Sequence, residues 1–412
     1  MSIYFYKKTM KRLFFYFVFV LMVTLCVQPI AYPDPSKIPS AEEYQLRKGP
    51  YLIYSGKNTQ MKVLWQLKNT ACCAISWGAD TSYSLGTTTT KEYGKDHQHA
   101  FTIKKLKPGT KYYYKVVAGN TDYPGSFLTS PNNDEKKIQF FVYGDTRSFP
   151  YIHNEIAGSI ISEYTNVPAL QTFALFVGDM VTFGAEESSW ETDIFSLANT
   201  NINKMMTSLP ILSCVGNHEL FFKDYKGTDD KLTLFKKYFP YPFIKDTYWS
   251  FDYGPAHFVI LDQYSEHLET KEIEWLKKDL KSSKKHWKFI CLHVPGWSAS
   301  NDATHQNDEV VQQLIQPVLE EHNVTAVFAG HNHYYARAIV NGIYHITAAG
   351  GGAPLYDPEP YSPEVITTSK SYHYCKVDID QDVMVFKAVK PDGTIIDTFT
   401  LTLKIIEKPS LN

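Results

Sequence analysis

Five near-continuous apolar runs constrain the fold of this 412-residue chain more than any other feature. They are IQFFVYGD, FALFVGDM, PILSCVGN, WKFICLHV and TAVFAGHN, and each ends in a glycine or in a polar residue that can bind a metal ion. Strands that lack polar alternation are buried on both faces, as in a sheet that helices cover. Between the runs lie helix-like segments such as TKEIEWLKKDLKSS, where Ile273, Leu276 and Leu280 recur at helical spacing. The pattern predicts an α/β domain.

The pattern from about Lys48 to Thr129 is different. MKVLWQL, CCAISWG and KYYYKVVAG are short aromatic or apolar segments, separated by turn signals such as KNTA and KPGT, and no helical period interrupts them. Such spacing is typical of a small β-sandwich. The polar segment SPNNDEKK (Ser130–Lys137) follows it and predicts a domain boundary. A chain of this length is also expected to form two domains.

The N-terminal residues have the composition of a secretory signal. Lys7, Lys8, Lys11 and Arg12 precede the apolar run LFFYFVFVLMVTLCV. Its length fits the roughly 7–15 apolar residues of a signal peptide better than the ~20 of a membrane span. We expect residues 1–31 to be removed on export, leaving a secreted or periplasmic protein without an integral membrane span. An uncleaved membrane anchor is the alternative.

The net charge and the cysteine spacing indicate which binding partners and which cysteine roles to expect. The formal net charge is −2, which gives no reason to expect nucleic acid as a partner. Beyond residue 31 the chain has Cys72, Cys73, Cys214, Cys291 and Cys375. Their spacing fits neither a disulfide framework nor a zinc site, so we expect most of them to be small buried apolar residues.

The residues that carry chemistry lie at the ends of the apolar runs. In chain order they are Asp145 in YGDTR, Asp179 in VGDMV, Asn217 and His218 in VGNHE, His293 in CLHVP, and His331 with His333 in AGHNH. Each by itself is more often a turn, a helix cap or a structural histidine. Taken together they should converge, because loops at the carboxyl ends of strands in an α/β sheet meet at one edge. Oxygen and imidazole ligands suit zinc, manganese, iron or cobalt, and two such ions about 3.5–4 Å apart activate water against a phosphoryl group.

This ordered set resembles the motifs of the calcineurin-like metallophosphoesterases, GDx(H/G), GDxx, GNH(D/E), a lone histidine and GHxH. The segments RKGPYLIYSG, MKVLWQL and LKPGTKYYYKV resemble the fibronectin type III-like N-terminal domain of purple acid phosphatases. YWSFDYGPAHFVILD and YHITAAGGGAPLY are similar to the same family. The resemblance implies a fibronectin type III-like β-sandwich over residues 45–132, followed by a four-layer α/β/β/α metallophosphoesterase sandwich over residues 137–405.

The resemblance also implies a role for each motif residue. Asp145 and His333 would hold a first metal ion, Asp179 would bridge, and a second ion would be held by Asn217, His293 and His331. His218 would contact the phosphoryl oxygens or protonate the leaving group. Glu219 would orient His218, or would be a surface carboxylate.

The implied activity is hydrolysis of phosphate monoesters by a hydroxide held between two divalent ions of iron, zinc or manganese. The partner is then a phosphorylated small molecule. Two alternatives stay open: a metal-dependent phosphodiesterase acting on nucleotide or lipid-type diesters, and a non-catalytic surface binding module with a decayed phosphatase domain.

The chain departs from the family pattern at two positions. Purple acid phosphatases have a tyrosine where this chain has Thr182, so we expect a pair of divalent ions rather than a ferric–tyrosinate site. Arg147 stands where relatives have glycine or histidine, so the first metal lacks one protein ligand. Arg147 would bind phosphate through its planar fork or pair with a nearby acid. His153 would supply the missing ligand or lie on a helix surface, and His305 would face the substrate or be a solvated loop residue.

Overall fold

The computed structural model describes residues 46–223, 230–300, 302–359 and 362–403. The expected signal peptide, residues 1–31, lies outside these ranges, as do the expected domain limits at residues 45 and 405. No helix within the described ranges has the length and apolar character needed to cross a membrane.

The front of the chain folds as two antiparallel sheets, which confirms the expected β-sandwich. The sheets have the strand orders β1-β2-β5 and β4-β3-β6-β7. The strands are β1 (Leu46–Ile53), β2 (Gln60–Leu67), β3 (Cys73–Gly78), β4 (Gly86–Thr90), β5 (Gln98–Lys104), β6 (Lys111–Ala118) and β7 (Thr121–Leu128). Strand β6 alternates buried and half-buried residues, so Tyr112, Tyr114 and Val116 face the interior of the sandwich.

Two mixed sheets form the rest of the described chain, with strand orders β10-β9-β8-β18-β19-β20 and β11-β12-β13-β14-β16-β15-β17. The strands of the first are β8 (Lys137–Tyr143), β9 (Ala174–Phe176), β10 (Ile211–Ser213), β18 (Tyr374–Asp380), β19 (Val383–Val389) and β20 (Ile395–Thr402). Those of the second are β11 (Trp249–Tyr253), β12 (Ala256–Ile260), β13 (Trp287–Cys291), β14 (Ala326–Ala329), β15 (Tyr335–Val340), β16 (Ile343–Ala348) and β17 (Val365–Ser369). All five apolar runs are strands (β8, β9, β10, β13 and β14), and each lies beside a parallel neighbour.

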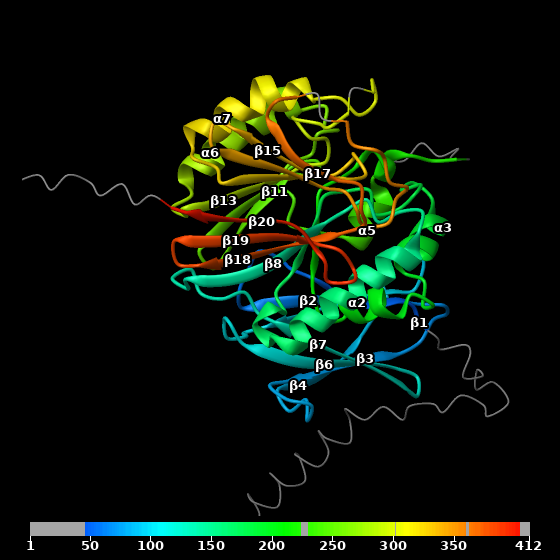
Figure 1. The fold of residues 1–412 in the computed structure, drawn as a ribbon. Helices are drawn as coiled ribbons and strands as arrows, with labels where there is room; N and C mark the ends of the chain where they lie inside the picture. Colours follow the sequence, from blue (N-terminus) through cyan, green and yellow to red (C-terminus); the bar gives the residue numbers. More distant parts are fainter. Residues whose placement is uncertain (1–45, 224–229, 301, 360–361, 404–412) are drawn as a thin grey trace, which may run out of the picture. The chain divides into compact units, whose positions relative to one another are not determined.

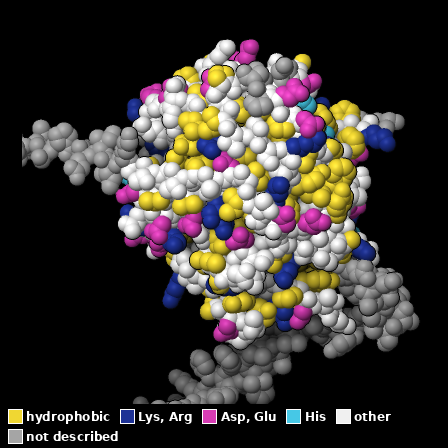
Figure 2. All heavy atoms as spheres, in the orientation of Figure 1, with side chains coloured by type: hydrophobic (Ala, Val, Ile, Leu, Met, Phe, Trp, Pro, Cys, Tyr) yellow, Lys and Arg dark blue, Asp and Glu magenta, His cyan; other side chains and the backbone are white. Residues whose placement is uncertain are grey.

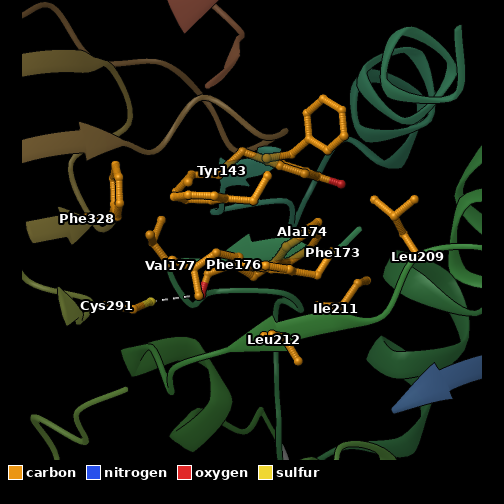
Figure 3. Packing of buried hydrophobic residues seen from close by; sticks show 14 of the residues in the cluster. Tyr143, Phe173, Ala174, Phe176, Val177, Leu209, Ile211, Leu212, Cys291 and Phe328 are labelled. Atoms are coloured by element: carbon orange, nitrogen blue, oxygen red, sulfur yellow. Dashed lines mark hydrogen bonds between the residues drawn. The ribbon is translucent and has the colours of Figure 1, made fainter. Parts of the chain in front are cut away.

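The two mixed sheets pack face to face through aromatic side chains. The ring of Phe140 on β8 makes edge contacts with Phe258 on β12 and Phe289 on β13, at centroid distances of 5.1 and 5.4 Å. Figure 3 shows the same interior farther along the strands, where Phe328 faces Tyr143. The interior is therefore dry and tightly packed where it supports the strand ends.

Helices cover the outer faces of the two sheets. The longer helices are α2 (Pro150–Asn166), α4 (Thr200–Met206), α5 (Thr233–Tyr238), α6 (Ile273–Ser282) and α7 (Gln316–Glu321). Shorter helical turns are η3 (Pro168–Leu170), α3 (Glu187–Ser189), η4 (Trp190–Ile194), η5 (Asn217–Leu220), η6 (Leu268–Glu272) and η7 (Val311–Ile315). Helix α6 buries Ile273, Leu276 and Leu280, as its spacing predicts. It lies with α7 over the seven-stranded sheet, whereas α2 lies against the other sheet (Figure 1). The expected α/β/β/α layering is confirmed.

Most of the cysteines are buried, as the sequence analysis predicts. Cys73, Cys214, Cys291 and Cys375 are buried and free, and Cys72 is exposed and free. The Cys291 thiol donates to the Phe176 carbonyl oxygen at 3.4 Å (Figure 3). Basic and acidic side chains are interspersed on the face drawn in Figure 2.

The buried His257 connects strands β11 and β12 to helix α6 through hydrogen bonds. His257 on β12 hydrogen-bonds through Nδ1 to Asp252 Oδ1 on β11 at 2.7 Å, and through Nε2 to Asp279 Oδ2 on α6 at 2.8 Å. Carboxylates only accept, so both ring nitrogens carry protons. Burial opposes this charge, but the hydrogen bonds and charges of the two carboxylates outweigh it and raise the pKa of His257 to about 9.

We therefore expect the stabilisation by His257 to depend on pH. A raised folded-state pKa stabilises fully below the unfolded value of about 6.5, and the effect disappears as the pH rises through about 9. Replacing His257→Gln should lower the free energy of unfolding by on the order of 2 kcal/mol near pH 6, and by clearly less near pH 10. Urea unfolding at both pH values measures this. An equal loss at both would contradict a charged His257.

Candidate metal centre

The predicted metal ligands meet at one edge of the two mixed sheets. Asp145, Asp179 and His293 follow β8, β9 and β13, and they bring ligand atoms within 4.8 Å of one another. All three are buried. Asn217, His331 and His333 complete the group through the contacts described below. The structure thus brings together the six side chains that the motifs predict, from positions up to 188 residues apart in the chain (145 to 333).

Backbone conformation aims these side chains at one another. Asp145, Asp179 and His331 have positive φ angles of 54°, 53° and 67°, which turns the chain sharply after each strand. The motif glycines permit the close approach. A Cβ atom on Gly330 would lie 2.6 Å from Asp145 Oδ2, and one on Gly216 would clash with the Asp179 carboxylate. The glycine of each motif is therefore a steric requirement of the site.

Asn217 Oδ1 lies close to one ring nitrogen of His293 and one of His331, and none of these three atoms carries a proton. His293 Nδ1 donates to the Val177 carbonyl at 2.7 Å, so its Nε2 presents a lone pair 3.0 Å from Asn217 Oδ1. His331 Nε2 donates to the Thr304 carbonyl at 2.9 Å, so its Nδ1 presents a lone pair 3.0 Å from the same oxygen. Burial lowers the pKa of His331 to about 4, which keeps the ring neutral. These lone pairs would repel one another unless a cation lies between them, and the donor set fits a metal ion.

Glu219 fixes the backbone of two motif loops. This fully buried carboxylate accepts N–H groups from Asp179 at 3.0 Å, Met180 at 2.8 Å and Gly216 at 2.7 Å. The expectation of a surface carboxylate is therefore wrong, and Glu219 contacts backbone amides rather than the His218 ring. The sequence position next to His218 gave no signal for this, because the side chain points inward to the loops on either side of the site.

His218 lies beside the cluster with one ring nitrogen fixed. Its Nδ1 donates to the Thr182 carbonyl at 2.8 Å, and its backbone N–H donates to Asp179 Oδ1 at 2.9 Å. Its Nε2 is 3.9 Å from Asp179 Oδ2. Thr182 occupies the position where purple acid phosphatases have a tyrosine. Its hydroxyl donates to Asp193, which lies outside the cluster, at 2.9 Å.

Arg147 lies within the cluster and pairs with an acid, one of the two alternatives for this residue. Its Nε donates to Asp179 Oδ2 at 3.4 Å, and its Nη2 lies 3.3 Å from His333 Nε2. The sequence analysis missed Tyr356, whose ring stacks on His333 at 4.3 Å and whose hydroxyl interacts with Arg147. In the sequence, the one sign of Tyr356 is that it follows shortly after three consecutive glycines.

The other two predicted histidines have different places. His305 is next to the cluster, with its ring 5.1 Å from that of His331 and 4.7 Å from that of Tyr356. His153 is in the core, where its Nε2 is 3.1 Å from the Tyr143 hydroxyl, and burial lowers its pKa to about 3. The expectation of a helix-surface histidine is wrong for His153, because the buried face of α2 carries it against β8.

Comparison with known proteins agrees with this geometry. Residues 160–335 match the calcineurin-like phosphoesterase family, and residues 48–132 match the purple acid phosphatase N-terminal domain. The chain thus carries a calcineurin-like phosphoesterase domain after a purple acid phosphatase-type N-terminal domain. The second match coincides with the front β-sandwich, β1 to β7.

Among its relatives, the chain is 27% identical over 281 residues to a purple acid phosphatase of Glycine max, covering 64% of this chain and 58% of the relative. It is 26% identical over 295 residues to a phosphoenolpyruvate phosphatase of Allium cepa, covering 67% and 57%. The chain thus spans less than two thirds of each relative. The structure of a purple acid phosphatase from yellow lupin (Lupinus luteus) seeds aligns with a TM-score of 0.68 at 18% identity, covering 86% of this chain and 74% of that one. At that identity the alignment shows a shared fold.

The position of Glu219 generates a testable expectation for the centre. Replacing Glu219→Ala leaves three buried N–H groups without an acceptor, which costs about 1–3 kcal/mol for each group that water does not reach. We expect a lower melting temperature together with a reduced metal content, because the Asp179 and Asn217 loops lose their shared anchor. Thermal unfolding and elemental analysis measure the two effects. The exposed Glu309→Ala is the matched control, and equal behaviour of the two variants would contradict the anchoring role.

Proposed function

We propose that this phosphoesterase hydrolyses phosphate monoesters with the help of bound metal. The observation that carries the proposal is the convergence of the lone pairs of His293 and His331 on Asn217 Oδ1, beside the buried Asp179 carboxylate. Neutral imidazoles and carboxyl or amide oxygens are ligands of divalent iron, zinc and manganese. The names of the relatives, purple acid phosphatase and phosphoenolpyruvate phosphatase, support a phosphate-ester substrate.

The proposed metal ligands form two groups around the Asp179 carboxylate. Asn217, His293 and His331 lie on the side of its Oδ1 atom. Asp145 and His333 lie on the other side, where Arg147 donates to Oδ2. Metal bound by these donors supplies Lewis-acid polarisation of the phosphoryl group and activation of water at neutral pH. His153 is left out of the proposed set because its Nε2 is engaged by Tyr143.

The chain's own polar groups bind and orient the ester. The Arg147 guanidinium presents a permanent positive charge and a planar fork of donors to phosphoryl oxygens. His218, held through Nδ1 by the Thr182 carbonyl, keeps Nε2 available to hold a proton for the leaving-group oxygen. His305 and Tyr356 form an aromatic wall beside His331 and His333 that would contact the organic part of the substrate. Action outside the cytoplasm is proposed from the N-terminal sequence alone.

Substrate preference tests the proposed reaction. Metal-loaded protein should hydrolyse para-nitrophenyl phosphate faster than bis(para-nitrophenyl) phosphate, and Asp179→Asn should lower the monoester rate by about 10²-fold or more, because it removes one charge of the site. Release of nitrophenolate measures both rates. A faster diester rate would favour the diesterase alternative, and no turnover of either ester by metal-loaded protein would favour a binding module.

The role of His218 has a separate test that depends on the leaving group. An alkyl phosphate needs a proton on its leaving oxygen, whereas nitrophenolate leaves without one. His218→Asn should therefore slow an alkyl phosphate by roughly 10²–10⁴-fold and para-nitrophenyl phosphate by much less. Rates on the two esters give the ratio. The exposed His286→Asn should leave both rates unchanged, and equal losses on both esters in His218→Asn would exclude proton donation as its role.

A further inference from the structure

The two oxygens of the Asp179 carboxylate face different kinds of cation site. Oδ1 lies 3.4 Å from His293 Nε2, on the side where the lone pairs of His293 and His331 converge on Asn217. Oδ2 lies 3.4 Å from Arg147 Nε and 3.9 Å from His218 Nε2. A carboxylate that would bridge two metal ions is thus bonded on one side to a side-chain cation of this chain.

His333 meets the same guanidinium. The Pro354 carbonyl accepts a hydrogen bond from His333 Nδ1 at 2.8 Å, which leaves Nε2 as the lone-pair nitrogen of the ring. That lone pair is 3.3 Å from Arg147 Nη2 and 3.5 Å from Asp145 Oδ1. The nitrogen expected to bind the first metal therefore accepts a hydrogen bond from Arg147.

The guanidinium is held in this place by its surroundings. The backbone N–H groups of Thr146 and Arg147 both donate to the Asp179 carbonyl, at 3.0 and 3.4 Å. Arg147 Nη1 donates to Ser148 Oγ at 3.2 Å, and the Tyr356 hydroxyl interacts with the same side chain. The Arg147 side chain is only 13% exposed, so the surrounding protein leaves little space for a different side-chain conformation.

A guanidinium cannot ligate a metal. It has no lone pair to give and stays protonated at every pH at which the protein is folded. A divalent ion bound to Asp179 Oδ2 and His333 Nε2 would lie against this positive charge, in a buried site where repulsion between like charges is strong. In the described part of the chain, the donors on the Oδ1 side are hydrogen-bonded to backbone carbonyls and to one another, not to an arginine or lysine. The two halves of the site therefore differ in whether a metal ion fits.

From this geometry we infer that Arg147 takes the place of the first cation, so that the protein binds one metal ion per chain at Asp179, Asn217, His293 and His331. The inference rests on the metal centre of the proposed function and differs from the two ions that the family resemblance implies. The site would then keep two cations beside the phosphoryl group, the metal ion and the guanidinium. Asp145, which accepts the His331 N–H at 3.0 Å and lies 3.5 Å from His333 Nε2, adds a negative charge to the same cluster.

Metal stoichiometry tests the inference. The full chain, its Arg147→Gly and Arg147→His variants and an Arg47→Gly control are loaded with excess Mn²⁺, freed of unbound ion by gel filtration and measured by elemental analysis. Arg47 on β1 pairs with Glu191 on η4 rather than with a residue of the cluster, so its replacement removes the same charge without removing a group of the site. We expect one ion in the wild type and the control, and a second ion in Arg147→Gly and Arg147→His.

Electron paramagnetic resonance on the same samples supplies a second readout. The wild type should give the hyperfine pattern of an isolated Mn²⁺ ion, and the Arg147 variants that of an exchange-coupled pair. Two ions in the wild type would overturn the inference, as would a single ion in the wild type and in both Arg147 variants. If one variant does not fold, the other variant and the wild type still decide.

Hydrolysis of para-nitrophenyl phosphate by the same preparations separates the two proposals. Two bound ions with turnover would overturn the role of Arg147 and leave the proposed function standing. One bound ion without turnover of any ester would overturn the proposed function and leave the metal stoichiometry as inferred. Protein that binds no ion at all would overturn both.

Discussion

The whole site depends on two carboxylates, Asp145 and Asp179, that are buried side by side. They are 0% and 1% exposed, and a buried negative charge is costly unless positive charge and hydrogen-bond donors surround it. The chain meets this need with backbone N–H groups from His218 and His331 and with the Arg147 guanidinium. The lone pairs of His293 and His331 that meet at Asn217 also need a positive charge beside them. A cation at that point satisfies the carboxylate and the imidazoles together.

The surrounding fold sets which atom of each side chain faces the centre. Three histidine rings are oriented by backbone carbonyls, His293 by Val177, His331 by Thr304 and His333 by Pro354. Each carbonyl accepts one ring N–H and so leaves the other nitrogen as a donor of its lone pair. Glu219 does the equivalent for the backbone, because it accepts three N–H groups from two loops. The centre is thus pre-organised by groups that would not touch the substrate.

The front sandwich is connected to the segment that follows Asp179. Lys48 of β1 is fully buried, donates to Gln66 within the sandwich at 2.8 Å, and pairs with Glu187 at 2.5 Å and with Glu191 at 3.4 Å. Glu187 and Glu191 belong to α3 and η4, which begin only a few residues after Thr182. A buried lysine without these acids would be strongly destabilising, so the sandwich and this segment hold their positions jointly.

The sequence by itself determined the strands, their order and the residues at their ends. Short apolar runs that end at turn residues are typical of strands in a sheet covered on both faces, and parallel strands bring their carboxyl ends to one edge. Tertiary structure alone decided the direction of each side chain there. Glu219 turns inward beneath two loops, His153 packs against Tyr143, and Tyr356 reaches His333. Arg147 was visible as a departure from the family pattern, but not its contacts with Asp179 and His333. Those contacts join residues far apart in the chain, and only the closed loops fix their distances.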